Sequence, residues 1–454
     1  MSENQNIVLI SWDSVRADQL PMYGYERQTT PYLAEIAEDG LVFDDTHVTG
    51  VGTPTSFTGA FTGEHAHAVQ ANIDPEHWRE SNAGRRLLSE ALQDAGYTTG
   101  AIHANALMSR YYGWNRGWNT FKDHLWTEGG DTEQAQRWSA FKKTTVLPLL
   151  RKYNLAGPVI HAKNILLDQP AYASWEDLWG DVQAFVEEAP EPWFLWVLLV
   201  DTHHPWTAPD EYQAWPQPGR RVTNGWNYVM RRYPEFTGTR KPIIVNAYDN
   251  ELRHADAFLR RFDELLEAHG YGDVPTIVHS DHGDELGEHD DYGHAPAMWD
   301  TVTRVPLVMR NVGETGRVDG PVTLKDLGST VLDLAGSDER LNDRPSLLGS
   351  EREDREHVYV ENRTMDGDRL AAAVGRDGWK VIRHADGTLE AYHRTDDPYE
   401  QRDRYGEHPT ELEEWLHAQI ARREQLAAGE ESTGGESDLD ASVQERLTEL
   451  GYID

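Results

Sequence analysis

Three aspartates in this chain stand where short apolar runs end, and three acids at one edge suggest metal chemistry. Asp13 follows the run 7–12, Asp201 follows the run 194–200, and Asp281 follows the run 275–280, with His282 and Gly283 directly after it. A buried carboxylate needs a positively charged partner, and carboxylates together with an imidazole can bind one cation where the chain turns sharply. An Asp-His pair alone is more often a turn with a surface histidine, but the second aspartate raises the expectation of a divalent metal.

Thr53 is a candidate nucleophile for attack on an anionic ester. It follows Gly50 and Gly52 and precedes Pro54, which suits the first position of a helix. The backbone N–H groups and the positive end of a helix favour bound anions, and a metal beside the hydroxyl would lower its pKa. The alternative is an ordinary N-cap threonine, which needs no catalytic role.

Histidines in two further segments could contact the substrate. His203 and His204 follow Asp201, which comes after the apolar run 194–200. Either histidine could bind the transferring anion, protonate the leaving oxygen or complete a second metal site with Asp201, whereas the alternative is a hydrogen-bonded histidine at the rim. His289 and His294 lie in a glycine-containing loop after the Asp-His pair, and His294 is the better candidate because Gly293 lets the backbone approach.

The elements that must position these residues belong to a layered α/β domain. The three apolar runs are typical of strands buried on both faces of a largely parallel sheet, whose carboxyl ends bind ligands along one edge. Helical patterns at 31–37, 86–95 and 245–266 alternate with the strands. Short runs between 358 and 393 predict a small antiparallel sheet.

The predicted organisation has three parts. Residues 1–350 form the catalytic α/β domain, with a tryptophan-rich insertion at the rim over about 122–192. Residues 351–425 form a small C-terminal α+β domain. Residues 426–454 are a flexible acidic linker followed by a short terminal helix.

The composition excludes several functions. The 454 residues carry a formal net charge of −36 and only eight lysines. Such an acidic surface disfavours nucleic acid and anionic membranes as partners, and it suggests adaptation to high internal salt. The absence of cysteine excludes thiol nucleophiles and thiolate metal sites. No run approaches the roughly 20 apolar residues of a membrane span, and no basic signal segment begins the chain, so a cytoplasmic location is expected.

Several blocks of sequence, in the expected order over nearly the whole chain, resemble the sulfatases of the alkaline phosphatase superfamily. The blocks are 13–18 with 23–25 and 29–31, 201–205, 280–289, 304–308, 379–383 and 397–401. The resemblance implies an alkaline-phosphatase-like layered fold. It also implies that Asp13, Asp281 and His282 are metal ligands, with Ser14 where many members have a second aspartate.

The resemblance further implies that His203 and His294 contact the substrate anion or the leaving group. The chain departs from the family at the nucleophile, where sulfatases have a cysteine or serine that becomes formylglycine. Here Thr53 stands at that position, Thr55 replaces a proline and Phe57 replaces an arginine. Threonine cannot form an aldehyde hydrate, but its hydroxyl can attack directly beside a metal.

Three functions remain open from the sequence. The first is a metal-dependent hydrolase of sulfate esters or related anionic esters, and the second is a phosphodiesterase or phosphoryl-group transferase acting through Thr53. The third is a non-catalytic protein that binds a sulfated or phosphorylated glycan. Sulfatase kinship favours calcium as the cofactor, whereas a threonine nucleophile favours manganese or zinc, and magnesium also fits oxygen ligands. The expected partner is a small-molecule or glycan anionic ester; the sequence does not reveal the oligomeric state.

Overall fold

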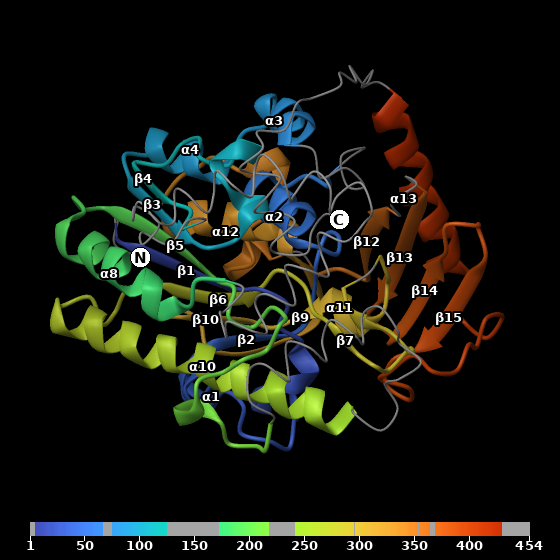
Figure 1. Ribbon diagram of the computed structural model, residues 1–454. Helices are drawn as coiled ribbons and strands as arrows, with labels where there is room; N and C mark the ends of the chain where they lie inside the picture. Colours follow the sequence, from blue (N-terminus) through green and yellow to red (C-terminus); the bar gives the residue numbers. More distant parts are fainter. Residues whose placement is uncertain are drawn as a thin grey trace, which may run out of the picture.

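The computed structural model describes residues 5–66, 75–124, 172–217, 241–294, 296–352, 354–363 and 368–428. Within these residues the fold is mixed α/β, with a nine-stranded main sheet and a separate four-stranded antiparallel sheet (Figure 1). This confirms the predicted fold class. Of the linker and terminal helix predicted at 426–454, residues 426–428 belong instead to helix α13 (Thr410–Ala428), and residues 429–454 lie outside the described residues, as does most of the predicted insertion.

The main sheet is largely parallel at its centre. Strand β1 pairs in parallel with β6 on one side and β5 on the other, and β3 and β4 continue the parallel order beyond β5. Strand β10 is antiparallel to β6 and β2, and β9 pairs with β2. In spatial order the strands are β11 (Gly316–Thr323), β2 (Leu41–His47), β10 (Leu307–Arg310), β6 (Thr276–Ser280), β1 (Ile7–Trp12), β5 (Trp193–Leu199), β3 (Thr98–His103) and β4 (Thr120–Lys122), with β9 (Arg304–Val305) beside β2.

Helices cover both faces of this sheet (Figure 1). The alternation of side chains along a strand explains why: Ile7 and Leu9 pack into one core cluster, and Val8 and Ile10 into the other. The first cluster lies under α2 (Thr53–Thr62), α3 (Pro75–Ala83), α4 (Leu88–Asp94) and α12 (Leu327–Leu334), and the second under α1 (Pro31–Asp39), α8 (Trp175–Glu188) and α10 (Lys241–Ala268).

The helices predicted at 31–37, 86–95 and 245–266 correspond to α1, α4 and α10. Helix α8 lies within the segment predicted as a rim insertion, yet it packs on the main sheet beside β3 and β5 and against α10. Two short strands, β7 (Glu285–Leu286) and β8 (Tyr292–Gly293), and the short helix α11 (Asp300–Thr303) follow β6.

The small sheet lies beside the main domain (Figure 1). Its strands β12 (His357–Arg363), β13 (Arg369–Gly375), β14 (Trp379–Arg383) and β15 (Leu389–His393) form a meander, which α13 (Thr410–Ala428) covers. Buried Lys380 of β14 reaches back to the catalytic part and donates to Asp300 at 2.8 Å.

Candidate active site

The carboxyl ends of β1 and β6 bring Asp13 and Asp281 side by side. Trp12 is the register partner of Ser280, so the two aspartates follow at the same level of the sheet. The backbone N–H of Asp281 donates to the carbonyl of Trp12 at 3.2 Å, and both carboxylates are fully buried. The parallel register of β1 and β6 thus brings together two residues that are far apart in the sequence.

Ser14 connects the two carboxylates. Its hydroxyl donates to Oδ1 of Asp13 at 2.9 Å, and its backbone N–H donates to Oδ1 of Asp281 at 3.2 Å. The φ angle of Ser14 is 67°, in the left-handed region that non-glycine residues rarely adopt. This turn lets one residue face both aspartates, and it lies where the resemblance expects a metal ligand.

His282 completes the group. Its Nδ1 lies 2.9 Å from the carbonyl oxygen of Gly283, an acceptor that fixes the proton on Nδ1 in the neutral ring. The lone pair of Nε2 then points toward the two aspartates. Nε2 lies 3.7 Å from Oδ1 of Asp13 and 3.8 Å from Oδ2 of Asp281. Both Nε2 and Oδ2 of Asp281 are buried without a hydrogen-bond partner among the described residues.

Burial controls the charge state of the two carboxyl groups. It raises the pKa of Asp13 to about 8, with a further contribution from the charge of Asp281, and it raises the pKa of Asp281 to about 7. Buried acids with raised pKa values require a positive partner to ionise near neutral pH. Two such acids and an imidazole with a converging lone pair therefore fit a divalent cation.

Thr53 is the first residue of α2 and lies beside this group. Gly52, with a φ of 101°, is the N-cap and supplies no side-chain cap, while Pro54 occupies the second helical position. The hydroxyl of Thr53 accepts from Asn105 Nδ2 at 3.3 Å, and it lies close enough to Asp281 to lower the pKa of that carboxyl. The alternative that Thr53 is an N-cap threonine is therefore wrong, because Gly52 is the N-cap of α2 and the helix has no side-chain cap bond.

Asn105 is a site residue that the sequence pattern did not reveal. Its Nδ2 donates to Oδ2 of Asp13 at 2.8 Å as well as to Thr53. Its Oδ1 accepts from the backbone N–H of Leu107 at 2.9 Å, which fixes the orientation of the amide. The available signal was its position two residues beyond β3, at the same edge of the sheet as Asp13.

The two positions after the nucleophile that differ from the sulfatase pattern have structural roles here. The Thr55 hydroxyl donates to the carbonyl oxygens of Val51 and Gly52, at 2.9 and 2.7 Å. Phe57 is fully buried, and its ring centroid lies 5.0 Å from that of Trp196. The position at which sulfatases have an arginine therefore faces the core and not the anion.

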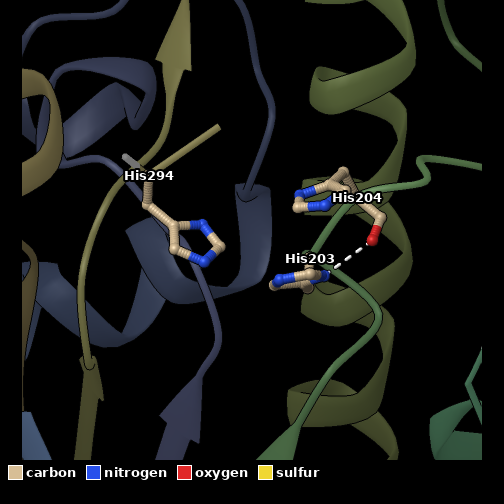
Figure 2. Close-up of side chains that lie close together, drawn as sticks. All are labelled: His203, His204 and His294. Carbon is tan, nitrogen blue, oxygen red and sulfur yellow. Dashed lines mark hydrogen bonds between the residues drawn. The ribbon is translucent and has the colours of Figure 1, made fainter. Parts of the chain in front are cut away.

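A second group of histidines adjoins the first. His203 and His204 lie opposite His294, and the Nδ1 of His203 lies 2.6 Å from the carbonyl oxygen of His204 (Figure 2). One nitrogen from each of the three rings lies within 4.8 Å of the others. The ring centroids of His294 and His282 are 4.3 Å apart, so the two groups are continuous.

Asp284 holds His294 in this position, because its Oδ1 lies 2.8 Å from Nδ1 of His294. His282, Asp284 and His294 also satisfy the spacing of a metal-binding group, with atoms within 4.8 Å. The structure thus brings His203 and His294 to the site, and His204 with them. His289 points elsewhere, toward Glu285 at 2.9 Å.

Asp201 does not join Asp13 and Asp281. Trp12 is the register partner of Leu199, so Asp13 lies level with Val200, and Asp201 is one residue further along. Successive side chains of a strand point to opposite faces. The Asp201 carboxylate accordingly accepts from the backbone N–H of Trp175 at 3.1 Å and faces His254.

Comparison with known proteins identifies the family of this chain. The family model described as Sulfatase matches residues 5–337, and the chain belongs to the sulfatase family. It is therefore an enzyme of the class that hydrolyses sulfuric esters, a class whose fold also serves phosphoryl hydrolysis and transfer. Among the described residues, no helix combines the length and apolar character needed to cross a membrane.

Three relatives illustrate the range of this fold. A sulfatase of Formosa agariphila is 23% identical over 425 residues, which cover 88% of this chain and 82% of the relative. The phosphonate monoester hydrolase of Agrobacterium radiobacter has a TM-score of 0.66 and 18% identity, covering 93% of this chain and 96% of that chain. The C-terminal periplasmic domain of EcEptC from Escherichia coli, in complex with zinc, has a TM-score of 0.54 and 16% identity, covering 79% and 90%.

Proposed function

We propose that this chain is a metal-dependent hydrolase of sulfate esters or related anionic esters in which Thr53 is the nucleophile. The observation that carries the proposal is the position of the Thr53 hydroxyl, which accepts from Asn105 at 3.3 Å and lies close enough to Asp281 to lower the pKa of that carboxyl. The same asparagine donates to Asp13 at 2.8 Å. The hydroxyl is thus oriented at the edge of a group of metal-binding donors.

In the proposed reaction, Thr53 is the nucleophile, Asp281 is the proton acceptor, and a histidine is the proton donor. As the bond from Thr53 Oγ1 to the sulfur or phosphorus forms and the bond to the leaving oxygen breaks, the hydroxyl proton passes to the neighbouring Asp281 carboxylate. His203 or His294 donates a proton to the leaving oxygen. Water then displaces Thr53 from the ester, and the threonine oxygen regains a proton.

Asp13, Asp281 and His282 would hold the divalent cation, whose positive charge stabilises the charge that develops on the reacting anion. An imidazole among the ligands favours zinc or manganese over calcium, which binds oxygen ligands. Calcium remains the expectation from sulfatase kinship. Metal analysis of the purified protein decides between them.

Phosphodiester hydrolysis or phosphoryl transfer through a phosphothreonine at Thr53 is the second candidate. The nucleophile favours it, because threonine cannot become formylglycine and the chain contains no cysteine. In addition, Phe57 removes the arginine that sulfatases use near the nucleophile. The expected ester, on a sugar, lipid or aryl alcohol, is a small molecule or a glycan in either case.

A substrate panel tests the proposal. Aryl sulfates and phosphate diesters are assayed with calcium, manganese, zinc and magnesium at high salt, for the native chain and for Thr53→Ala, Thr53→Ser and Asp281→Ala. We expect turnover that Thr53→Ala and Asp281→Ala lower by at least 10³-fold and that Thr53→Ser partly retains. The preferred ester distinguishes sulfatase from phosphodiesterase.

Thr58→Ala is the matched control, because Thr58 lies on the same helix and its hydroxyl bonds only to the carbonyl of Pro54 among the described residues. Turnover that survives Thr53→Ala would count against both mechanisms. Ligand binding without turnover under every metal would support the non-catalytic alternative, which hydrolysis sensitive to Asp281→Ala excludes.

A further inference from the structure

A second cluster of acidic groups and an imidazole lies beside the loop that carries His203. Glu176 comes from the first turn of α8, Asp201 from the loop after β5, and His254 from the middle of α10. One donor atom from each lies within 4.8 Å of the others. Three elements that are distant in sequence therefore converge on one point outside the Thr53 site.

The contacts of His254 define the cluster. Its Nε2 lies 2.8 Å from Oε1 of Glu176, and its Nδ1 lies 3.2 Å from Oε2 of Glu251 and 3.6 Å from Oδ1 of Asp201. The side chains of His254, Asp201 and Glu251 are 3%, 2% and 5% exposed. Of the three carboxylates around this ring, those of Asp201 and Glu251 are buried and that of Glu176 is 36% exposed, so the group carries net negative charge when all three are ionised.

Asp201 supplies an independent indication of a ligand. Its Oδ1 accepts from the backbone N–H of Trp175, but its Oδ2 is buried without a hydrogen-bond partner among the described residues. Asp201, Glu251 and His254 also line a cavity of about 110 Å³, to which His203 contributes one wall. An unsatisfied carboxylate oxygen at a small, acidic cavity costs free energy unless a cation or a donor fills it.

We propose that Glu176, Asp201 and His254 bind a second divalent cation of the zinc or manganese type. Ligands about 2.1 Å from one ion lie about 3 to 4 Å from each other, so small side-chain shifts suffice. When Nε2 of His254 binds the ion, Nδ1 still faces the Glu251 carboxylate at 3.2 Å, the arrangement that fixes the orientation of metal-binding histidines. The cation links the loop that contains Asp201 and His203 to helices α8 and α10. Its ligands are therefore positioning residues for His203.

Metal binding to stripped protein tests this assignment without any activity assay. The background is Asp281→Ala, which removes a ligand of the Thr53 site, and Mn²⁺ or Zn²⁺ is titrated by calorimetry, with Mn²⁺ also followed by electron paramagnetic resonance. We expect one ion to remain bound in Asp281→Ala, and Glu176→Gln or Asp201→Asn in that background to weaken its binding at least tenfold. Glu187→Gln, on the exposed face of the same helix, is the matched control and leaves binding unchanged.

Hydrogen exchange provides a second measurement. In Asp281→Ala the ion slows amide exchange in residues 200–208, and in Asp281→Ala/Glu176→Gln it does not. An ion that both Glu176→Gln and Asp201→Asn retain at full affinity lies elsewhere and overturns the assignment. The assignment is also overturned if ¹⁵N resonance shows that both nitrogens of His254 stay protonated in the presence of saturating Zn²⁺. Circular dichroism of each variant verifies that the fold is intact.

Discussion

Nδ2 of Asn105 lies 3.3 Å from Oγ1 of Thr53 and donates to it. The same nitrogen donates to Asp13 at 2.8 Å, and the carbonyl oxygen of the amide is held by the backbone of Leu107. One amide therefore connects the proposed nucleophile with a proposed metal ligand. Its hydrogen bonds to a charged group and to the attacking oxygen contribute more than an ordinary pair.

Replacing Asn105 tests this function. We expect Asn105→Ala to lower kcat/KM by about 10- to 100-fold, the effect of losing a hydrogen bond worth about 1.5 to 3 kcal/mol. Steady-state kinetics on the preferred ester measures it. Asn246→Ala, whose amide bonds to Arg27 and Pro216 away from the site, is the control. Unchanged kinetics in Asn105→Ala would show that the amide only fills space.

Phe57 gives a prediction about stability at the position where sulfatases have arginine. The ring is fully buried against Trp196 and Phe61. We expect Phe57→Ala to lower the free energy of unfolding by about 3 to 5 kcal/mol, and Phe57→Arg to lower it further because the charge has no partner in the core. Denaturant unfolding measures both. Tyr399→Ala, at a ring that is 42% exposed, should change it by less than about 0.5 kcal/mol.

A Phe57→Arg variant that folds stably and gains aryl sulfatase activity would contradict this view. It would mean that the start of α2 can turn position 57 toward the anion. In that case only the side chain at position 57 would differ from the sulfatase pattern. The face of α2 that carries this position would still be able to contact the anion.

The sequence was sufficient to predict the central strands and the meeting of Asp13 with Asp281. Uninterrupted apolar runs identify strands that are buried on both faces, and an aspartate directly after each run falls at the ligand-binding edge. Parallel register then determines which aspartates meet. The same reasoning failed for Asp201 because register cannot be read from one chain segment: one extra residue after β5 turns its side chain to the opposite face.

Asn105 escaped prediction for a related reason. An asparagine after a strand is typical of a turn, and only the place of β3 in the sheet, next to β5, brings it near Thr53. The departures at Thr55 and Phe57 were visible in the sequence, but their structural roles depend on which face of α2 meets the core. Side-chain contacts between distant segments are properties of the packed fold.

The charge balance leads to a prediction about salt. With a formal net charge of −36, the folded chain is destabilised by repulsion between acidic groups. Because the Debye length falls from about 10 Å at 0.1 M to about 3 Å at 1 M, we expect Tm to rise by several degrees between 0.1 and 2 M KCl. An uncharged osmolyte at equal osmolality should raise it less. Loss of the folded circular dichroism signal in concentrated salt, with full signal in dilute buffer, would refute adaptation to high salt.

The raised pKa values of Asp13 and Asp281 determine how the stability of the metal-free protein varies with pH. Burial raises these pKa values to about 8 and about 7, whereas an unfolded aspartate has a pKa of about 3.9. Between about pH 4 and 8 the native state therefore binds more protons than the unfolded state. The contribution of both groups to stability is complete below about pH 4 and is lost as the pH rises through the folded pKa values.

A divalent cation reverses this balance because it binds the ionised carboxylates. We expect the increase in Tm on adding Zn²⁺ or Mn²⁺ to be larger at about pH 8.5 than at about pH 5.5, measured by calorimetry in 2 M KCl to screen surface charge. In Asp13→Asn/Asp281→Asn the amides cannot titrate, so the metal-free protein should lose less stability over this range, and the part of the metal effect that grows with pH should shrink. If native and double-variant chains show parallel pH profiles, with and without metal, the two aspartates do not hold the cation.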